Sequence, residues 1–283
     1  MHTLSQKLNK LLSDRAELDL SLARNLQKSI LQEAIQGKLV PQIADEGTAE
    51  KLLAEIRKEK ERLVKEGKLK KSALSDSVIY KGDDNKYYEQ VGKSDKEITE
   101  EIAFDLPNGW SWCRLKDICS IFTGATFKKE ETVTTKEGVR ILRGGNISPF
   151  ELRIKDDDIF LTKDKVKEDI ILKENDILTP AVTSLENIGK MVRVNSDMPN
   201  TTVGGFVFII RLYLKNQWLS KYILYLLSSP FMIDFMKSIT NKSGQAFYNI
   251  GKERLSTALL PIPSLAEQHR IVAQIEKLFE QLR

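Results

Sequence analysis

The sequence predicts an α+β protein in which one mixed α/β domain lies between long helices of the coiled-coil type. Leucines recur at intervals of three, four and seven residues near the N-terminus, and apolar residues recur at similar intervals near the C-terminus. This spacing is typical of helices with one apolar seam. Between the two seams, short apolar runs alternate with turns rich in Gly, Asn and Asp, which predicts short strands.

The first helix is predicted over residues 4–36, where neither Gly nor Pro interrupts the chain. Gly37 is expected to cap this helix, and Pro41 prevents its continuation. Arg15 replaces a leucine in the seam, as polar residues do where they select the register or the partner of a coiled coil. The leucines of the seam are Leu4, Leu8, Leu11, Leu18 and Leu22.

A second helix is predicted over residues 48–66, with one apolar and one charged face, and it ends at Gly67. Residues 72–103 are polar and rich in Gly and Asp in their middle. They are expected to form an ordered arm with little regular structure.

Beyond residue 104 the apolar pattern predicts a compact domain. Short strands are expected at residues 139–143, 158–161, 176–179, 190–194 and 206–210. Residues 218–239 predict an amphipathic helix or helix pair, broken near Pro230. Ser264 and Glu267 form the pattern of a capping box that starts a distal helix, whose apolar residues are Ile271, Ile275, Leu278 and Leu282.

The predicted organisation therefore has four parts. Residues 1–42 form a spacer helix, 43–103 a second helix with a connecting arm, 104–263 the compact domain, and 264–283 the start of the distal helix. The net charge of +4 lies in residues 1–72, which hold 15 basic and 11 acidic residues. The N-terminus has no secretory signal and no apolar run is long enough for a bilayer, so a cytoplasmic location is predicted.

No catalytic residue is predicted. Lys190 and Lys252 each follow a glycine, but the other residues of a phosphate-binding loop are missing. Glu66 and Lys68 have the E-x-K spacing of many nucleases, yet they end a charged helix with no strand around them. A solvated helix end is therefore favoured.

No metal site is predicted either. The chain has two cysteines, Cys113 and Cys119, and two histidines, His2 and His269. Their number and spacing do not fit a zinc site or a disulfide framework. Buried, reduced thiols are favoured for the cysteines, and a surface position for His269.

Four polar and basic turns remain as candidate DNA-binding loops. Arg, Asn and Gln match the edges of G and A in the major groove, and Lys, Ser, Thr and glycine N–H groups suit phosphates. Ordinary turns use the same residues, so an ordinary turn is favoured for any loop taken alone, whereas four together make DNA recognition an equal alternative. The candidate DNA-binding residues are Thr123, Gly124, Thr126, Lys128, Lys129, Arg143, Gly144, Asn146, Thr183, Ser184, Lys190, Lys242, Ser243, Gln245 and Asn249.

Several stretches resemble the DNA-specificity (S) subunit of Type I restriction–modification systems. Residues 27–42 resemble the end of its central conserved helix, and residues 49–71 resemble the helix that follows. Residues 104–115, with Trp110 and Trp112, are similar to the entry of a target recognition domain. Residues 175–178 resemble the Gly-Asp-Ile-Leu strand of such domains, with Asn175 in place of the glycine, and residues 265–272 resemble the start of the distal conserved helix.

The resemblance implies a non-catalytic subunit, acting in defence against foreign DNA, that reads a half-site of double-stranded DNA and docks methyltransferase (M) subunits. The restriction (R) subunit would join that complex. It implies no cofactor in this chain, since S-adenosylmethionine, ATP and Mg would be bound by the partner subunits. Such subunits usually carry two recognition domains, whereas this chain has one, so it resembles the second half of the pattern, as a natural half-subunit or as a fragment.

The leucine seam is too long to be covered by the distal helix of the same chain. A bare stripe of leucines is costly in water, so self-association into a homodimer with antiparallel helices is predicted, with Ile271, Ile275 and Leu278 also on the seam. Two other functions stay open. One is a coiled-coil adaptor whose domain binds another protein, and the other is a self-sufficient nuclease or methyltransferase, which the missing motifs oppose.

Overall fold

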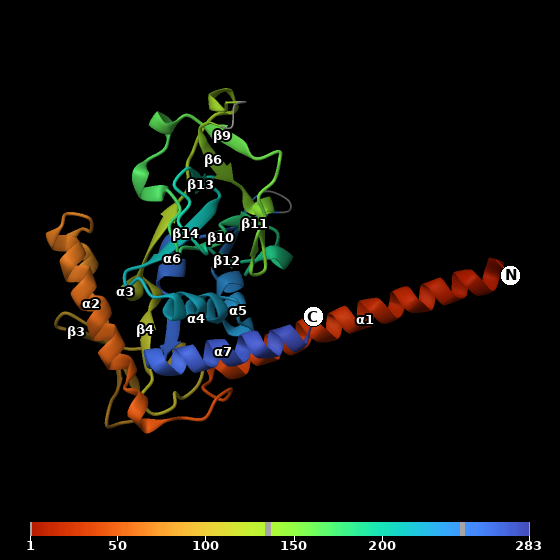
Figure 1. The fold of residues 1–283 in the computed structure, drawn as a ribbon. Coiled ribbons are helices and arrows are strands. Elements are labelled where there is room, and N and C mark those ends of the chain that lie inside the picture. The colour runs from red at the N-terminus through yellow and green to blue at the C-terminus, as the bar shows by residue number, and fades with distance from the viewer. Residues whose placement is uncertain (1, 134–136, 244–246, 283) are drawn as a thin grey trace.

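The computed structural model describes residues 2–133, 137–243 and 247–282, apart from the side chains of residues 2–5, 7, 8 and 243. It is a mixed α/β domain, as predicted, from whose base one long helix projects (Figure 1). None of the helices in these parts of the chain has the length and apolarity needed to cross a lipid bilayer.

The projecting helix, α1 (His2–Ile35), has 34 residues. Its C-terminal end is buried, with Leu31, Ala34 and Ile35 in the main apolar core. The helix α7 (Leu265–Gln281) begins beside the end of α1 and runs back along it, so that the C-terminus lies near the middle of α1 (Figure 1). The N-terminal half of α1 extends beyond the domain. The two helices are therefore long and antiparallel, whereas a coiled coil along the N-terminal half of α1 stays a prediction.

The helix α2 (Ala49–Lys65) leads into an arm that contains more regular structure than predicted. The arm is a three-stranded antiparallel sheet of β1 (Ser77–Lys81), β2 (Tyr87–Val91) and β3 (Ser94–Glu97). The prediction of little regular structure is wrong because Asn85 and Gly92, both at positive φ, form the two turns of a meander. Few of its side chains reach the core, so its strands lack a strong apolar pattern.

The compact domain is built around a four-stranded antiparallel sheet in the order β12 (Val192–Arg193), β10 (Ile177–Pro180), β14 (Val207–Leu212) and β5 (Cys119–Thr123). Alternate residues of its central strands face opposite sides, as the two-residue period of a strand requires. Ile177 and Ile210 lie in the core shared with the helices. Leu178 and Ile209 lie in a second core against a sheet in the order β13 (Thr201–Val203), β6 (Val139–Leu142) and β9 (Ile159–Leu161). The domain therefore has three layers, helices, sheet and sheet.

The five predicted strands and the predicted helix pair are confirmed, with small shifts at their ends. Asn216 and Ser229 cap the two helices of the pair through their side-chain oxygens, and Pro230 starts the second helix. The remaining helices are α3 (Leu115–Ile118), α4 (Gln217–Leu227), α5 (Pro230–Ser238) and α6 (Lys252–Ser256). The remaining strands are β4 (Ser111–Arg114), β7 (Ile147–Ser148), β8 (Glu151–Leu152), β11 (Val182–Thr183), β15 (Thr240–Ser243), β16 (Phe247–Ile250) and β17 (Leu259–Ile262).

The entry and the exit of the domain lie side by side, since β4 pairs with β17. Ser264 caps α7 by accepting a hydrogen bond from the backbone N–H of Glu267 at 3.2 Å. The Glu267 carboxylate does not return to Ser264, as a capping box would require. It accepts hydrogen bonds from Trp110 Nε1 at 2.9 Å and from Gln42 Nε2 at 2.7 Å, and so joins the entry, the exit and the end of α1.

Candidate DNA-recognition face

The segment after β10 lies at the centre of the candidate face. Ala181 donates its backbone N–H to the carbonyl of Phe206 at 2.8 Å and accepts a hydrogen bond from the N–H of Ile250 at 2.9 Å. The chain therefore passes from the four-stranded sheet, through Pro180, directly into a smaller sheet in the order β11-β16-β15.

The first two candidate loops lie against the turn that joins β13 to β14. In the first loop, Ala125 donates its N–H to the carbonyl of Val203 at 2.8 Å. At the start of the second loop, the carbonyl of Leu142 accepts a hydrogen bond from Gly204 at 2.8 Å. The turn of residues 203–207 therefore touches both loops.

The third and fourth candidate loops belong to the smaller sheet. Thr183 of β11 is opposite Tyr248 of β16, and Lys242 of β15 is opposite the same tyrosine. Strand pairing thus places Thr183, Lys242 and Asn249 in one small sheet, directly beyond β10. The first two loops therefore lie at the turn of residues 203–207 and the last two in the smaller sheet, and Ala181, which is bonded to Phe206 and to Ile250, connects the two pairs.

Three of the predicted DNA-binding residues are buried in the structure, and their contact with DNA stays a prediction. Gly124 is buried, and a Cβ built on it would lie 2.0 Å from the carbonyl oxygen of Val203, so it permits close packing of two backbones. Asn146 is 1% exposed and uses its amide within the loop: it accepts from Arg143 N–H at 2.7 Å and donates to Asp158 at 2.6 Å. Thr183 is also buried. Gly124 and Asn146 therefore shape the loops.

The other described candidates reach the surface in whole or in part. Arg143 is exposed, and its Nη2 donates to the carbonyl and to the carboxylate of Asp157 at 3.1 and 3.2 Å. That aspartate is itself exposed, so the pair is a surface pair that holds the guanidinium in solvent. Exposed with it are Thr123, Thr126, Lys128, Lys129, Lys242 and Asn249, while Gly144, Ser184 and Lys190 are half-buried.

Contact of these residues with DNA stays a prediction. The predicted residues Ser243 and Gln245 cannot be placed, since the side chain of Ser243 and all of Gln245 lie outside the described residues.

Sequence reasoning missed two exposed phenylalanines on this face. Phe206 was assigned to a strand at residues 206–210, but β14 begins at Val207 and the Phe206 side chain is 73% exposed. Phe247, at the start of β16, is also exposed. The signal that could have marked Phe206 is Gly204-Gly205, which predicts a turn immediately before it.

The predicted dimer seam divides into a bare part and a covered part. Leu11, Leu18 and Leu22 are exposed on the projecting part of α1. Ile271 and Ile275, by contrast, are fully buried in the core of their own chain and are excluded from a seam with a second chain. Leu278 is half-buried, and the side chains of Leu4 and Leu8 lie outside the described residues.

The bare leucines lie on a different face of α1 from the residues that the domain covers. At 100° per residue, Leu11, Leu18 and Leu22 are roughly 120–160° around the helix from the buried Ala34. The distal helix of the same chain therefore could not cover these leucines merely by being longer, because it follows the other face.

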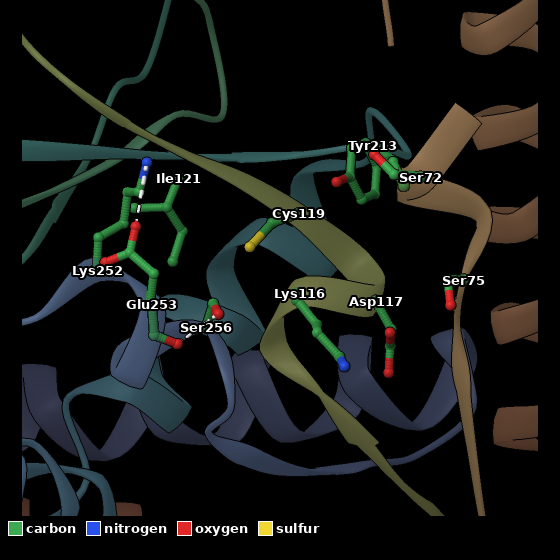
Figure 2. A pocket seen from close by; sticks show the side chains of 11 residues that line it. Ser72, Ser75, Lys116, Asp117, Cys119, Ile121, Tyr213, Lys252, Glu253 and Ser256 are labelled. Carbon is green, nitrogen blue, oxygen red and sulfur yellow. Dashed lines mark hydrogen bonds and ion pairs between the residues drawn. The ribbon is translucent and has the colours of Figure 1, made fainter. Parts of the chain in front are cut away.

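The structure also contains a small cavity of about 260 Å³ between the arm, β5 and α6 (Figure 2). Asp117 lines it, but its carboxylate accepts hydrogen bonds from Ser77 Oγ at 2.7 Å and from Arg114 N–H at 3.2 Å. Burial raises the pKa of Asp117 and also that of the Cys119 thiol above their ordinary values. A thiol of raised pKa is unreactive. Asp117 instead attaches the arm through its hydrogen bond from Ser77.

A buried ion pair attaches α2 to the same place. Lys60 is completely buried, donates to the carboxylate of Asp76, and reaches the carbonyl of Asp117 at 3.3 Å. Within the described residues, no group of His, Cys, Asp and Glu side chains could hold a metal ion.

The layered domain, its polar loops and its projecting helix together define a class of protein, a binding domain carried on a spacer. Comparison with known proteins identifies the family. A family model described as Type I restriction modification DNA specificity domain matches residues 107–283. The specificity subunits of the Escherichia coli Type I restriction enzymes EcoAI and EcoEI are 30% and 26% identical to this chain, each over 98% of it. The chain belongs to the family of Type I restriction–modification specificity subunits, which confirms the resemblance and its non-catalytic character.

The chain spans less than half the length of these two relatives, 42% and 43%. Among solved structures, the HsdS subunit from Thermoanaerobacter tengcongensis is 19% identical, with a TM-score of 0.45, over 94% of this chain and 50% of that one.

Proposed function

We propose that this chain is the DNA-sequence-recognition subunit of a Type I restriction–modification complex and that its domain reads one half-site of a bipartite target. The observation that carries the proposal is the connection of two pairs of polar loops, far apart in the sequence, through Ala181 of a domain from this family. Such an arrangement can present several hydrogen-bonding side chains to one short stretch of base pairs.

The charges on the face support double-stranded DNA as the ligand. Lys128, Lys129, Arg143 and Lys242 are exposed around the loops. The domain of residues 104–263 has 22 basic and 18 acidic residues, a net charge of +4, which the net charge of −4 on residues 73–103 balances. Local clusters of Lys and Arg supply the phosphate contacts that provide most of the affinity, while forked side chains such as Arg143 distinguish bases.

The chemistry of the complex belongs to other chains in this proposal. Methyltransferase subunits would dock on the helices and bind S-adenosylmethionine, and the restriction subunit, with ATP and Mg, would join through them. The family supports this assignment. The described polar residues of the domain support it too, since they either hold the loops together or lie on the surface.

The bare leucines of α1 support self-association. Leu11, Leu18 and Leu22 are each more than half exposed, and they form a stripe that no element of the described chain covers. Packing against the same stripe of a second copy, with the helices antiparallel, would bury it and place two identical domains at opposite ends of one rod. The DNA target would then be two inverted copies of one half-site.

The test is the selection of bound sequences from random double-stranded DNA, with the chain alone and with its methyltransferase subunit. We expect two inverted copies of a short element at a fixed separation, and an affinity that falls steeply as the salt concentration rises. A coiled-coil adaptor for proteins becomes the better explanation if no sequence is enriched under either condition.

A further inference from the structure

Phe206 is more exposed than any other large apolar side chain among the described residues, at 73%. Single exposed apolar residues are common, but this one stands at the centre of the candidate face. Its carbonyl accepts the hydrogen bond from Ala181, the residue that connects the two pairs of loops. Phe247, the first residue of β16, and Leu185, two residues after the end of β11, are also exposed.

The backbone that carries Phe206 is held on both sides. Gly204 donates to Leu142 at 2.8 Å, and Val207 closes the turn by donating to Gly204 at 3.0 Å. A Cβ built on Gly205 would lie 2.9 Å from Oγ1 of Thr126, so the turn also lies close against the first loop. An aromatic ring on a fixed turn loses little conformational freedom on binding, which favours Phe206 as a residue that contacts a ligand.

The surroundings of the ring decide which apolar group it would meet. The second loop, with the forked Arg143, is bonded to this same turn through Leu142, and forked groups of that kind match base edges in the major groove. The thymine 5-methyl is the apolar group that the unmodified bases present there. A wedge between base pairs would instead require entry from the minor groove.

We propose that Phe206 is a specificity-determining residue that contacts the 5-methyl group of one thymine in the half-site. The inference rests on the proposed function, because it names the base chemistry that this face reads. Loss of the ring should relax selection at one A·T pair and leave the rest of the half-site unchanged.

The experiment uses the full chain, with its methyltransferase subunit if binding requires it, and the site selected from random DNA. Each thymine of the half-site is replaced in turn by deoxyuridine, which lacks only the methyl group. We expect one replacement to weaken binding by about fourfold, the effect of losing one buried methyl-sized group. In Phe206→Ala the same replacement should have no further effect. Phe247→Ala, a matched loss of an exposed phenylalanine on the same face, should keep the fourfold response.

The outcomes separate this inference from the proposed function. If the wild-type chain selects no sequence, the proposed function itself fails. If it selects a site but no deoxyuridine weakens binding, or if Phe206→Ala keeps the full response, Phe206 is not the methyl contact and only the inference fails. A loss of DNA bending in Phe206→Ala, without dependence on any thymine methyl, would overturn the inference in favour of a wedge. A thermal unfolding midpoint equal to that of the wild type, measured for both variants, shows that both are folded.

Discussion

At the scale of single residues, polar side chains on the candidate face divide by burial into those that hold the loops and those that DNA could reach. Asn146 and Arg143 are three residues apart in one turn, yet the first is buried with its amide fully used and the second is exposed. Sequence alone predicted the same role for both, because Asn and Arg each match base edges. The difference arises from Asp158, whose buried carboxylate needs the Asn146 amide as a donor.

Replacing Arg143 by alanine tests whether an exposed side chain of this face contributes to DNA binding. We expect sequence-specific DNA binding to weaken by about 1–3 kcal/mol, measured as the ratio of dissociation constants on the selected site. Folding should be unaffected, since the partner of Arg143 is a surface carboxylate. Arg153→Ala is the matched control, because Arg153 is exposed and paired with Glu151 in the same way. A thermal stability that falls in parallel with binding would make Arg143 a structural residue.

Glu267 gives the molecule a defined dependence of stability on pH. Burial raises the pKa of its carboxyl above the ordinary value of 4.5, against the opposing effect of its hydrogen bonds from Gln42 and Trp110. An acid with a raised pKa binds its proton more tightly in the folded state, so its contribution to stability is complete below pH 4.5 and is lost as the pH rises through the raised value.

Glu267→Gln should remove this contribution, because an amide does not titrate. The free energy of unfolding of the wild type, measured relative to that of the variant by denaturant titration, should fall as the pH rises from 4.5 toward neutrality. A difference that is constant over this range would show that folding leaves the pKa of Glu267 unchanged, and one that grows would show that the carboxylate is stabilised in the folded state.

At the scale of elements, the sequence predicts regular structure well where one residue pattern decides it. The helices α1 and α2 were predicted almost to the residue, since glycine and proline mark their ends. The arm strands β1, β2 and β3 were missed, because their polar residues pack on little and only the turns indicate them. The connection of the candidate loops was also beyond prediction. It depends on the pairing of β11 with β16, two strands separated by more than 60 residues, for which no local pattern exists.

The end of α1 provides a prediction with an internal control. Gly37 and Gly67 both end helices at positive φ, 69° and 71°. Alanine at either position should cost about 1 kcal/mol of folding free energy for the backbone conformation. A Cβ on Gly37 would also lie 2.4 Å from Cγ of Pro107, whereas nothing lies within 4 Å of one on Gly67. Chemical denaturation should therefore find Gly37→Ala clearly less stable than Gly67→Ala, and equal losses would show that the contact with Pro107 relaxes freely.

At the scale of the whole molecule, the two faces of α1 give the protein its proposed geometry. One face is bound by α7 and the helices of the same domain, which fixes the direction in which α1 leaves the domain. The other face carries the bare leucines, so the surface for a second chain has a fixed direction relative to the domain that carries the candidate face. The distance between two half-sites would then be set by the length of a helix of 34 residues, which spans roughly 51 Å.

Replacement of Leu11 and Leu18 by aspartate should separate the proposed dimer into monomers, because two buried carboxylates would face their copies across the seam. Each monomer should keep its fold and bind a single half-site weakly, while recognition of the inverted pair is lost. Sedimentation at micromolar concentration measures the first effect, and binding to DNA with one or two half-sites measures the second. Asn9→Asp with Ser13→Asp is the matched control, since it adds the same charge roughly 160° around the helix from the seam. A wild-type chain that sediments as a monomer, or that selects one asymmetric element, would contradict the two-fold arrangement and leave the leucine stripe to a different partner.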